Sequence, residues 1–259
     1  ARGEGNVMGQ LLRKLTALAW LLLWMAVAVQ SASAQKRYPS IEEAWDGTDY
    51  RALIQRVESD GLALPTLSDT ATKPVFIRMI DANNIPLRVG QNSKLSATIR
   101  FQRLDSALQP LQKLVVLYSN EVKKGRPCAS ELAKLMVYEA KVLAALLDVS
   151  DPYLSSLEKD KRYQFHVDAS RQMKSDARKR YADLVQSMAE TRTYATPDIL
   201  EMVRGALDGL PAYLPILTDQ DRQDLTQRLT QQIAKTADQA LKTSLTELRD
   251  AIKHRRIRT

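Results

Sequence analysis

The sequence predicts an all-α protein, with about seven to eight helices in a single domain that follows an N-terminal signal peptide. Strong helix formers dominate the chain, and no glycine lies between Arg126 and Arg204. No run of alternating apolar and polar residues is flanked by hairpin turns, which argues against a β-sheet. These observations leave helix packing as the expected architecture.

Residues 8–34 have the three-part layout of a secretory signal peptide: a basic start, an apolar run and a small-residue end. The end, Ala32-Ser33-Ala34, matches the A-x-A cleavage pattern, so we expect cleavage after Ala34 and an exported (periplasmic or secreted) protein. The alternative is an uncleaved anchor, but the apolar run is shorter than the roughly 20 residues of a membrane-spanning helix. Residues 1–7 are interpreted as an upstream extension and residues 35–39 as a short linker. We expect no transmembrane segment in the mature chain.

The first part of the predicted domain, residues 40–259, is expected to contain three helices. Ser40 and Glu43 fit a capping box, in which each side chain bonds a backbone N–H of the first turn, so a helix is predicted over 40–59. A short helix is predicted over 74–82. Recurring apolar residues predict an amphipathic helix over 96–124. Pro110 lies inside this helix, lacks an N–H and is expected to kink or break it.

The second part is expected to hold the core. The predicted helix over 130–148 has the most apolar face of the mature chain, so Leu143, Leu146 and Leu147 are expected to be buried. Ser150-Asp151-Pro152 is predicted to end it, and a long helix follows over 159–191. Thr196-Pro197-Asp198 opens a segment that the glycines and prolines at 205, 209, 211 and 215 are expected to break up. The last helical segments are 218–235, capped by Thr218 and Asp221, and 236–256; the sequence leaves open whether these two are continuous.

Cys128 is the single cysteine, so no intrachain disulfide can form and cysteine-based zinc sites are excluded. It precedes a predicted helix and lies near Lys123, Lys124 and Arg126, and both features lower the pKa of a thiol. Cys128 is therefore a candidate reactive thiol, and the alternative is a small apolar residue that fills the helix start. The two histidines fit neither E-x-x-H nor H-E-x-x-H, so no metal site and no cofactor are predicted.

Arg171, Lys174 and Arg178 form a basic ridge, because their spacing of three and four places them on one side of the helix predicted over 159–191. The apolar stripe of this helix lies about 100° away, so the ridge is expected to face water. Clustered cations attract phosphates and carboxylates, and salt weakens this attraction. We predict contact with anionic envelope components; the alternative is a solvated surface without a partner. Nearby acidic residues dilute the charge, so no nucleic-acid partner is expected.

Ser156-Leu157-Glu158-Lys159 matches the S-x-x-K of penicillin-binding enzymes, in which the lysine can activate the serine. The K-T-G element of those enzymes is absent, so a serine hydrolase using Ser156 and Lys159 is only a minor alternative, and no catalytic residue is predicted.

Leu217-Thr218-Asp219-Gln220-Asp221 resembles the L-T-x-x-Q signature of periplasmic stress chaperones, with Asp221 standing where their glutamine would be. This resemblance covers about 15 residues and implies a chaperone-like holdase. The physical alternative is an ordinary helix cap. The leading expectation is a non-enzymatic binding or scaffold protein of the cell envelope, whose partner is an anionic component or another envelope protein. The net charge of +8 at pH 7 agrees with an anionic partner.

Overall fold

The computed structural model describes residues 38–84 and 95–254, and this part of the chain contains eight α-helices and no β-strand. The helices are α2 (Gly47–Ser59), α3 (Lys73–Met79), α4 (Ala97–Lys123), α5 (Ala129–Ser156), α6 (Tyr163–Ser187), α7 (Thr196–Tyr213), α8 (Asp219–Lys235) and α9 (Gln239–His254). The predicted all-α class and single helical domain are confirmed. The predicted extension, the signal peptide with its cleavage after Ala34, and residues 35–37 of the linker lie outside the described residues.

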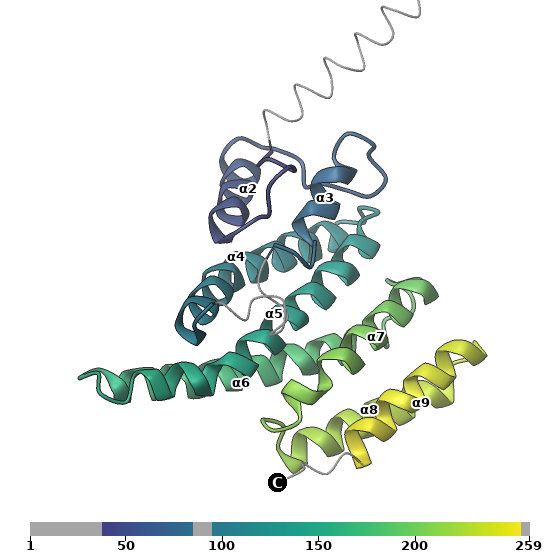
Figure 1. The fold of residues 1–259 in the computed structure, drawn as a ribbon. Helices are drawn as coiled ribbons and strands as arrows, with labels where there is room; N and C mark the ends of the chain where they lie inside the picture. Colours follow the sequence, from purple (N-terminus) through teal and green to yellow (C-terminus); the bar gives the residue numbers. More distant parts are fainter. Residues whose placement is uncertain (1–37, 85–94, 255–259) are drawn as a thin grey trace, which may run out of the picture.

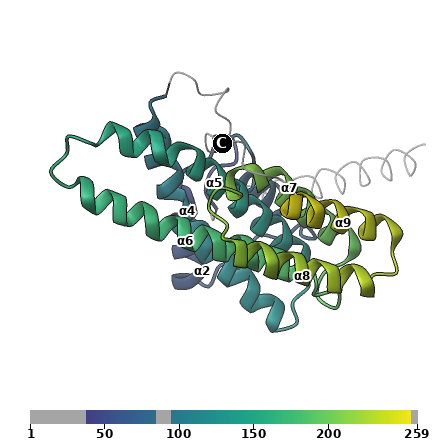
Figure 2. The same ribbon diagram turned by 90° about the horizontal axis from the view of Figure 1, so that it is seen from below.

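The helices are arranged around α5 (Figure 1). This helix packs against α4 on one side and α7 on the other, and it also contacts α6. α2 packs on α4, while α8 and α9 form a hairpin that contacts α6 through α8 and α7 through α9. Figure 2 shows the connection between α5 and α6 extending to one side, beyond the other helices. No helix of the described part is long and apolar enough to cross a membrane.

The prediction that α5 is the central helix is confirmed by its burial. Leu143, Leu146 and Leu147 are all buried, in a core to which every helix of the described part contributes. The helix is longer than predicted, because it continues through Pro152 to Ser156. Proline removes the bond to the carbonyl one turn earlier. That residue, Asp148, is solvent-exposed, so water can hydrate its carbonyl.

The predicted break-up of the segment after Thr196 is wrong at Gly205, Gly209 and Pro211, through which α7 runs unbroken, whereas the helix does end just before Pro215. The two glycines mark close packing. A Cβ atom on Gly205 would lie 2.5 Å from Cγ1 of Val137 on α5, and one on Gly209 would lie 3.8 Å from Cβ of Ala144. Glycine therefore lets the backbone of α7 approach α5, and the gain in packing exceeds its low helix propensity. α4 is likewise continuous through Pro110, so no break occurs there.

The first helix begins later than predicted. Ser40 lies outside any helix, and α2 starts after Asp46, which forms a capping box with Asp49. The reason is the burial of Trp45, whose Nε1 donates to the Ser40 carbonyl at 2.7 Å and whose backbone N–H donates to Asn84 Oδ1 at 3.0 Å. These contacts hold residues 40–46 out of a helix. The cap sequence at Ser40 is therefore overridden by tertiary packing.

The last two helices are separate, since α8 ends at Lys235 and α9 begins at Gln239. The predicted capping box of α8 is confirmed: Asp221 N–H donates to Thr218 Oγ1 at 3.1 Å, and Thr218 N–H donates to Asp221 Oδ2 at 2.8 Å. The start of α9 is capped by Asp238, because Leu241 N–H donates to Asp238 Oδ1 at 2.8 Å. The other predicted bounds are close, with α6 shorter than expected at both ends.

Candidate functional site

Two members of the basic ridge, Lys174 and Arg178, make ion pairs with neighbouring helices. Lys174 Nζ lies 2.8 Å from Asp151 Oδ1 of α5, and Arg178 Nη1 lies 3.5 Å from Asp221 Oδ2 of α8. Both basic side chains are only 32% exposed. The ridge was expected to face water. Lys174 and Arg178 do not point freely into water, because α6 lies between α5 and α8 at this point.

Arg171, the third member, is the most solvent-exposed, with 74% of its side chain accessible, and it pairs with Asp168 on the same helix at 2.9 Å. Exposed pairs of this kind contribute little to stability, about 0–1 kcal/mol. Arg171, Lys174 and Arg178 all line one cavity, as their spacing on one side of α6 allows. Their ion pairs with Asp168, Asp151 and Asp221 do not follow from that spacing.

Cys128 lies in the core at the start of α5, where its Sγ is 3.9 Å from the carbonyl oxygen of Tyr118. Burial raises the pKa of the Cys128 thiol, and the nearby Glu131 and Glu121 carboxylates raise it further against the opposing effect of Arg126. The pKa shift is thus opposite to the lowering on which the candidate reactive thiol rests. The position suits the alternative of a small apolar residue at a helix start.

Ser156 and Lys159, the minor hydrolase alternative, do not form a hydrogen-bonded pair within the described residues. Ser156 Oγ donates to the Tyr153 carbonyl at 2.6 Å and lies 3.3 Å from Thr98 Oγ1. The Ser156 hydroxyl proton is therefore bonded to a backbone carbonyl of α5. A serine nucleophile must instead transfer its proton to a general base.

The segment that resembles the chaperone signature has a structural role as the start of α8, because Thr218 and Asp221 form its capping box. Exposed large apolar side chains in the described part are Ile77, Ile99, Val116 and Phe165. They lie on three helices, and Ile99 and Val116 are about 25 Å apart along α4. These four side chains are therefore not gathered on one helix.

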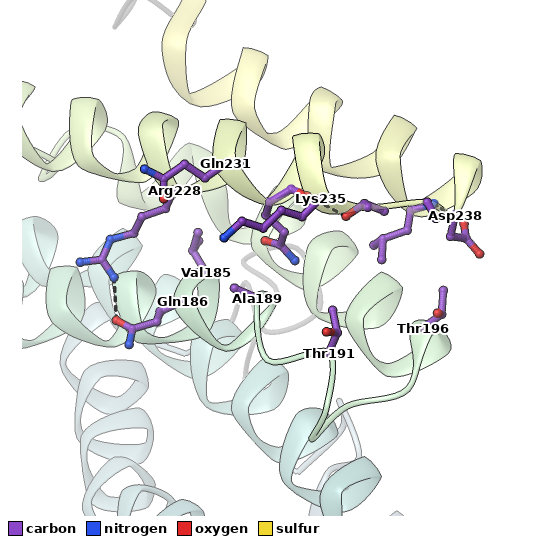
Figure 3. Close-up of a pocket in the computed structure, with 13 residues that line it drawn as sticks. Val185, Gln186, Ala189, Thr191, Thr196, Arg228, Gln231, Lys235 and Asp238 are labelled. Atoms are coloured by element: carbon purple, nitrogen blue, oxygen red, sulfur yellow. Dashed lines mark hydrogen bonds between the residues drawn. The ribbon is translucent and has the colours of Figure 1, made fainter.

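A different site, which we call the basic pocket, lies where α8 and α9 meet the end of α6 (Figure 3). The cavity has a volume of about 530 Å³. α8 contributes a row of long polar side chains spaced by three and four positions, which places them on one helix face: Arg228, Gln231, Gln232 and Lys235. The facing residues are Val185 and Gln186 of α6 and Ala189 just after its end. The lining is completed by Thr191, Thr196, Leu241 of α9 and the connection from Thr236 to Asp238.

Hydrogen bonds fix the walls of the basic pocket. Gln232 is buried, and its Nε2 donates to the Met188 carbonyl at the end of α6. Arg228 Nη1 donates to Gln186 Oε1 at 2.6 Å, so a second bond joins α8 to α6. Because Gln232 ties the base of the pocket to the backbone, the α8 face is held in place before any ligand arrives, which lowers the entropic cost of binding.

The basic pocket carries positive charge that the described residues leave unpaired. Neither Arg228 nor Lys235 forms an ion pair with any carboxylate of residues 38–84 and 95–254. Asp238 is the lining carboxylate, and it accepts the N–H of Leu241 at the start of α9. Figure 3 shows Arg228 and Lys235 on the side of α8 that faces α6. Two cations and three glutamine amides therefore surround a cavity that one carboxylate only partly neutralises.

The described residues contain no cluster of three or more His, Cys, Asp or Glu side chains placed to hold a metal ion. Comparison with known protein families, curated proteins and solved structures gives no match for this chain. The function must therefore be argued from the site itself.

Proposed function

We propose that this chain is an exported, non-enzymatic binding protein of the cell envelope, and that the basic pocket binds anionic envelope components. The observation that carries the proposal is the unpaired charge of Arg228 and Lys235 at the pocket wall. Hydrogen bonds from charged donors to carboxylate or phosphate oxygens are about twice as strong as neutral ones. An anionic ligand would gain such bonds without displacing an existing ion partner.

The chemistry of the lining favours an acidic saccharide within this class. Glutamine amides offer both donors and acceptors, which match sugar hydroxyls, and the lining threonines add hydroxyls of their own. Val185, Ala189 and Leu241 give the pocket an apolar part against which the C–H face of a sugar ring can pack. The volume of about 530 Å³ lies in the usual range for small-molecule sites.

Binding is tested by calorimetric titration of the protein with an oligogalacturonate, using a neutral maltooligosaccharide for comparison. We expect the parent to bind the acidic sugar, more weakly at high salt, and to return it chemically unchanged. Lys235→Gln should lower the affinity about 10- to 100-fold, because it removes a charged hydrogen-bond donor. Lys242→Gln on α9 is the matched control, since Lys242 is exposed and does not line the pocket.

Equal losses of affinity in Lys235→Gln and Lys242→Gln would mean that net charge alone causes the binding. That result would rule out the basic pocket as the binding site. Cleavage of the sugar would contradict the non-enzymatic part of the proposal. Export is supported by the layout of residues 8–34 and has its own test, because N-terminal sequencing of the exported protein should give Gln35-Lys36-Arg37. A product that retains Trp20 and Trp24 would mean an uncleaved anchor instead.

A further inference from the structure

A second cavity, which we call the ridge cavity, lies along the middle of α6, between the end of α5 and the connection from α7 to α8. Its volume is about 420 Å³. The polar side chains of its wall are Ser170, Arg171, Lys174, Ser175 and Arg178, and Leu154, Val167, Pro215 and Ile216 form the apolar part. It shares no lining residue with the basic pocket.

Ser170 is the unusual member of this wall. It is 94% buried, and its Oγ has no hydrogen-bond partner among the residues that the structure describes. A serine or threonine in a helix can donate to a carbonyl three or four positions earlier, as the buried Ser150 and the exposed Thr230 do elsewhere in this protein. A buried hydroxyl without a partner destabilises the fold, so its presence at the wall of a cavity needs an explanation.

Two cations that line the same cavity, Lys174 and Arg178, have bonding capacity left. Lys174 pairs with Asp151, whose side chain is 76% exposed, so this contact is easily exchanged. Arg178 lies 3.5 Å from Asp221, but that carboxylate already accepts bonds from the backbone N–H and the hydroxyl of Thr218, at 2.8 and 2.7 Å. A guanidinium has five N–H donors, so Arg178 can bond a further anion without releasing Asp221.

We propose that the ridge cavity binds a phosphate group, with the Ser170 hydroxyl donating to one phosphate oxygen and Lys174 and Arg178 neutralising the charge. A phosphate has several acceptor oxygens, so one group can satisfy the buried hydroxyl and both cations together. Arg171, at the exposed rim, adds charge that attracts the anion. The phosphate can belong to free phosphate or to a lipid headgroup, and the recognition chemistry is the same.

The test compares thermal melts and titrations of the full chain with inorganic phosphate, against chloride at equal ionic strength. We expect phosphate to raise the melting temperature of the parent, because a ligand that binds the folded state stabilises it. Ser170→Ala should melt at or above the parent temperature without phosphate, since it removes an unpaired hydroxyl. It should also bind phosphate at least about tenfold more weakly. A residue with only a structural role would not show this combination.

Lys174→Gln and Lys179→Gln form a matched pair on α6, because Lys179 is exposed and lies outside the cavity lining. Only Lys174→Gln should weaken phosphate binding. The second arm is cosedimentation with phosphatidylglycerol and phosphatidylcholine vesicles. Vesicle binding that Ser170→Ala abolishes assigns the phosphate to a lipid headgroup, whereas phosphate binding without vesicle binding assigns it to a free phosphate.

The proposal is overturned if the parent responds to neither probe, or if Ser170→Ala keeps full phosphate affinity. It is also overturned if the two lysine variants lose affinity equally. Ser170→Ala should leave oligogalacturonate binding unchanged, so failure of the ridge cavity and failure of the basic pocket are separate results.

Discussion

Replacement of Leu146 by alanine is expected to lower the free energy of unfolding by about 2–5 kcal/mol, the usual range for a fully buried leucine. Leu146 is completely buried on α5, the helix that contacts α4, α6 and α7. A cavity at this position removes contacts that join these helices, and the tight packing of α7 limits how far the structure can relax. Urea denaturation followed by circular dichroism measures the loss.

Leu157→Ala provides the control for this prediction. Leu157 follows the last residue of α5 and is only partly buried, so the same chemical change should have a clearly smaller effect. If Leu146→Ala unfolds at the same urea concentration as the parent, α5 is not the centre of the core.

Replacement of Glu139 by glutamine is expected to reduce the pH dependence of stability between pH 5 and pH 8. The Glu139 carboxyl is buried on α5, and its Oε1 lies 3.5 Å from Arg180 Nε of α6. Burial raises its pKa to about 7 from an ordinary value of 4.5; Asp183 raises it as well, while Arg180 and Gln112 oppose the shift. The proton is therefore bound more tightly in the folded state than in the unfolded state.

Because the folded state binds this proton more tightly, the contribution of Glu139 to stability is complete below pH 4.5. It is lost as the pH rises through about 7. The loss is about 3 kcal/mol at most, at about 1.4 kcal/mol for each pH unit between the two values. Denaturation at pH 5 and pH 8 should show that Glu139→Gln loses less stability over this interval than the parent. Glu247→Gln, which changes an exposed carboxyl of α9, should follow the parent curve. The same pH dependence in all three proteins would contradict the assignment.

Much of the fold can be predicted from the sequence because local signals and tertiary packing agree over most of the chain. The apolar face of α5 and the Thr218–Asp221 cap are examples in which the expected contacts form. The errors occur where the two disagree. The helix predicted to start at Ser40 does not form there, because Trp45 is buried. Gly205 and Gly209 allow close helix packing instead of ending a helix. Such outcomes depend on partners far away in the chain.

The candidate sites are harder to predict from the sequence, because each is built from several helices. The spacing of Arg171, Lys174 and Arg178 does place them in one cavity wall, but their partners Asp151 and Asp221 come from other helices. Arg228 and Lys235 are seven positions apart, so the sequence already implies a shared face of α8. What it cannot show is that the end of α6 and the start of α9 enclose that face.

The central claim is that the basic pocket, rather than diffuse surface charge, binds an anionic ligand. The most direct measurement is a titration of the ¹⁵N-labelled protein with an oligogalacturonate, followed by amide chemical shifts. We predict that the largest shifts fall on residues of the pocket, including the side-chain amides of Gln186 and Gln231 and the backbone amides around Lys235 and Leu241. Shifts spread over the basic residues of the surface, or an unchanged spectrum at saturating ligand, would contradict the account.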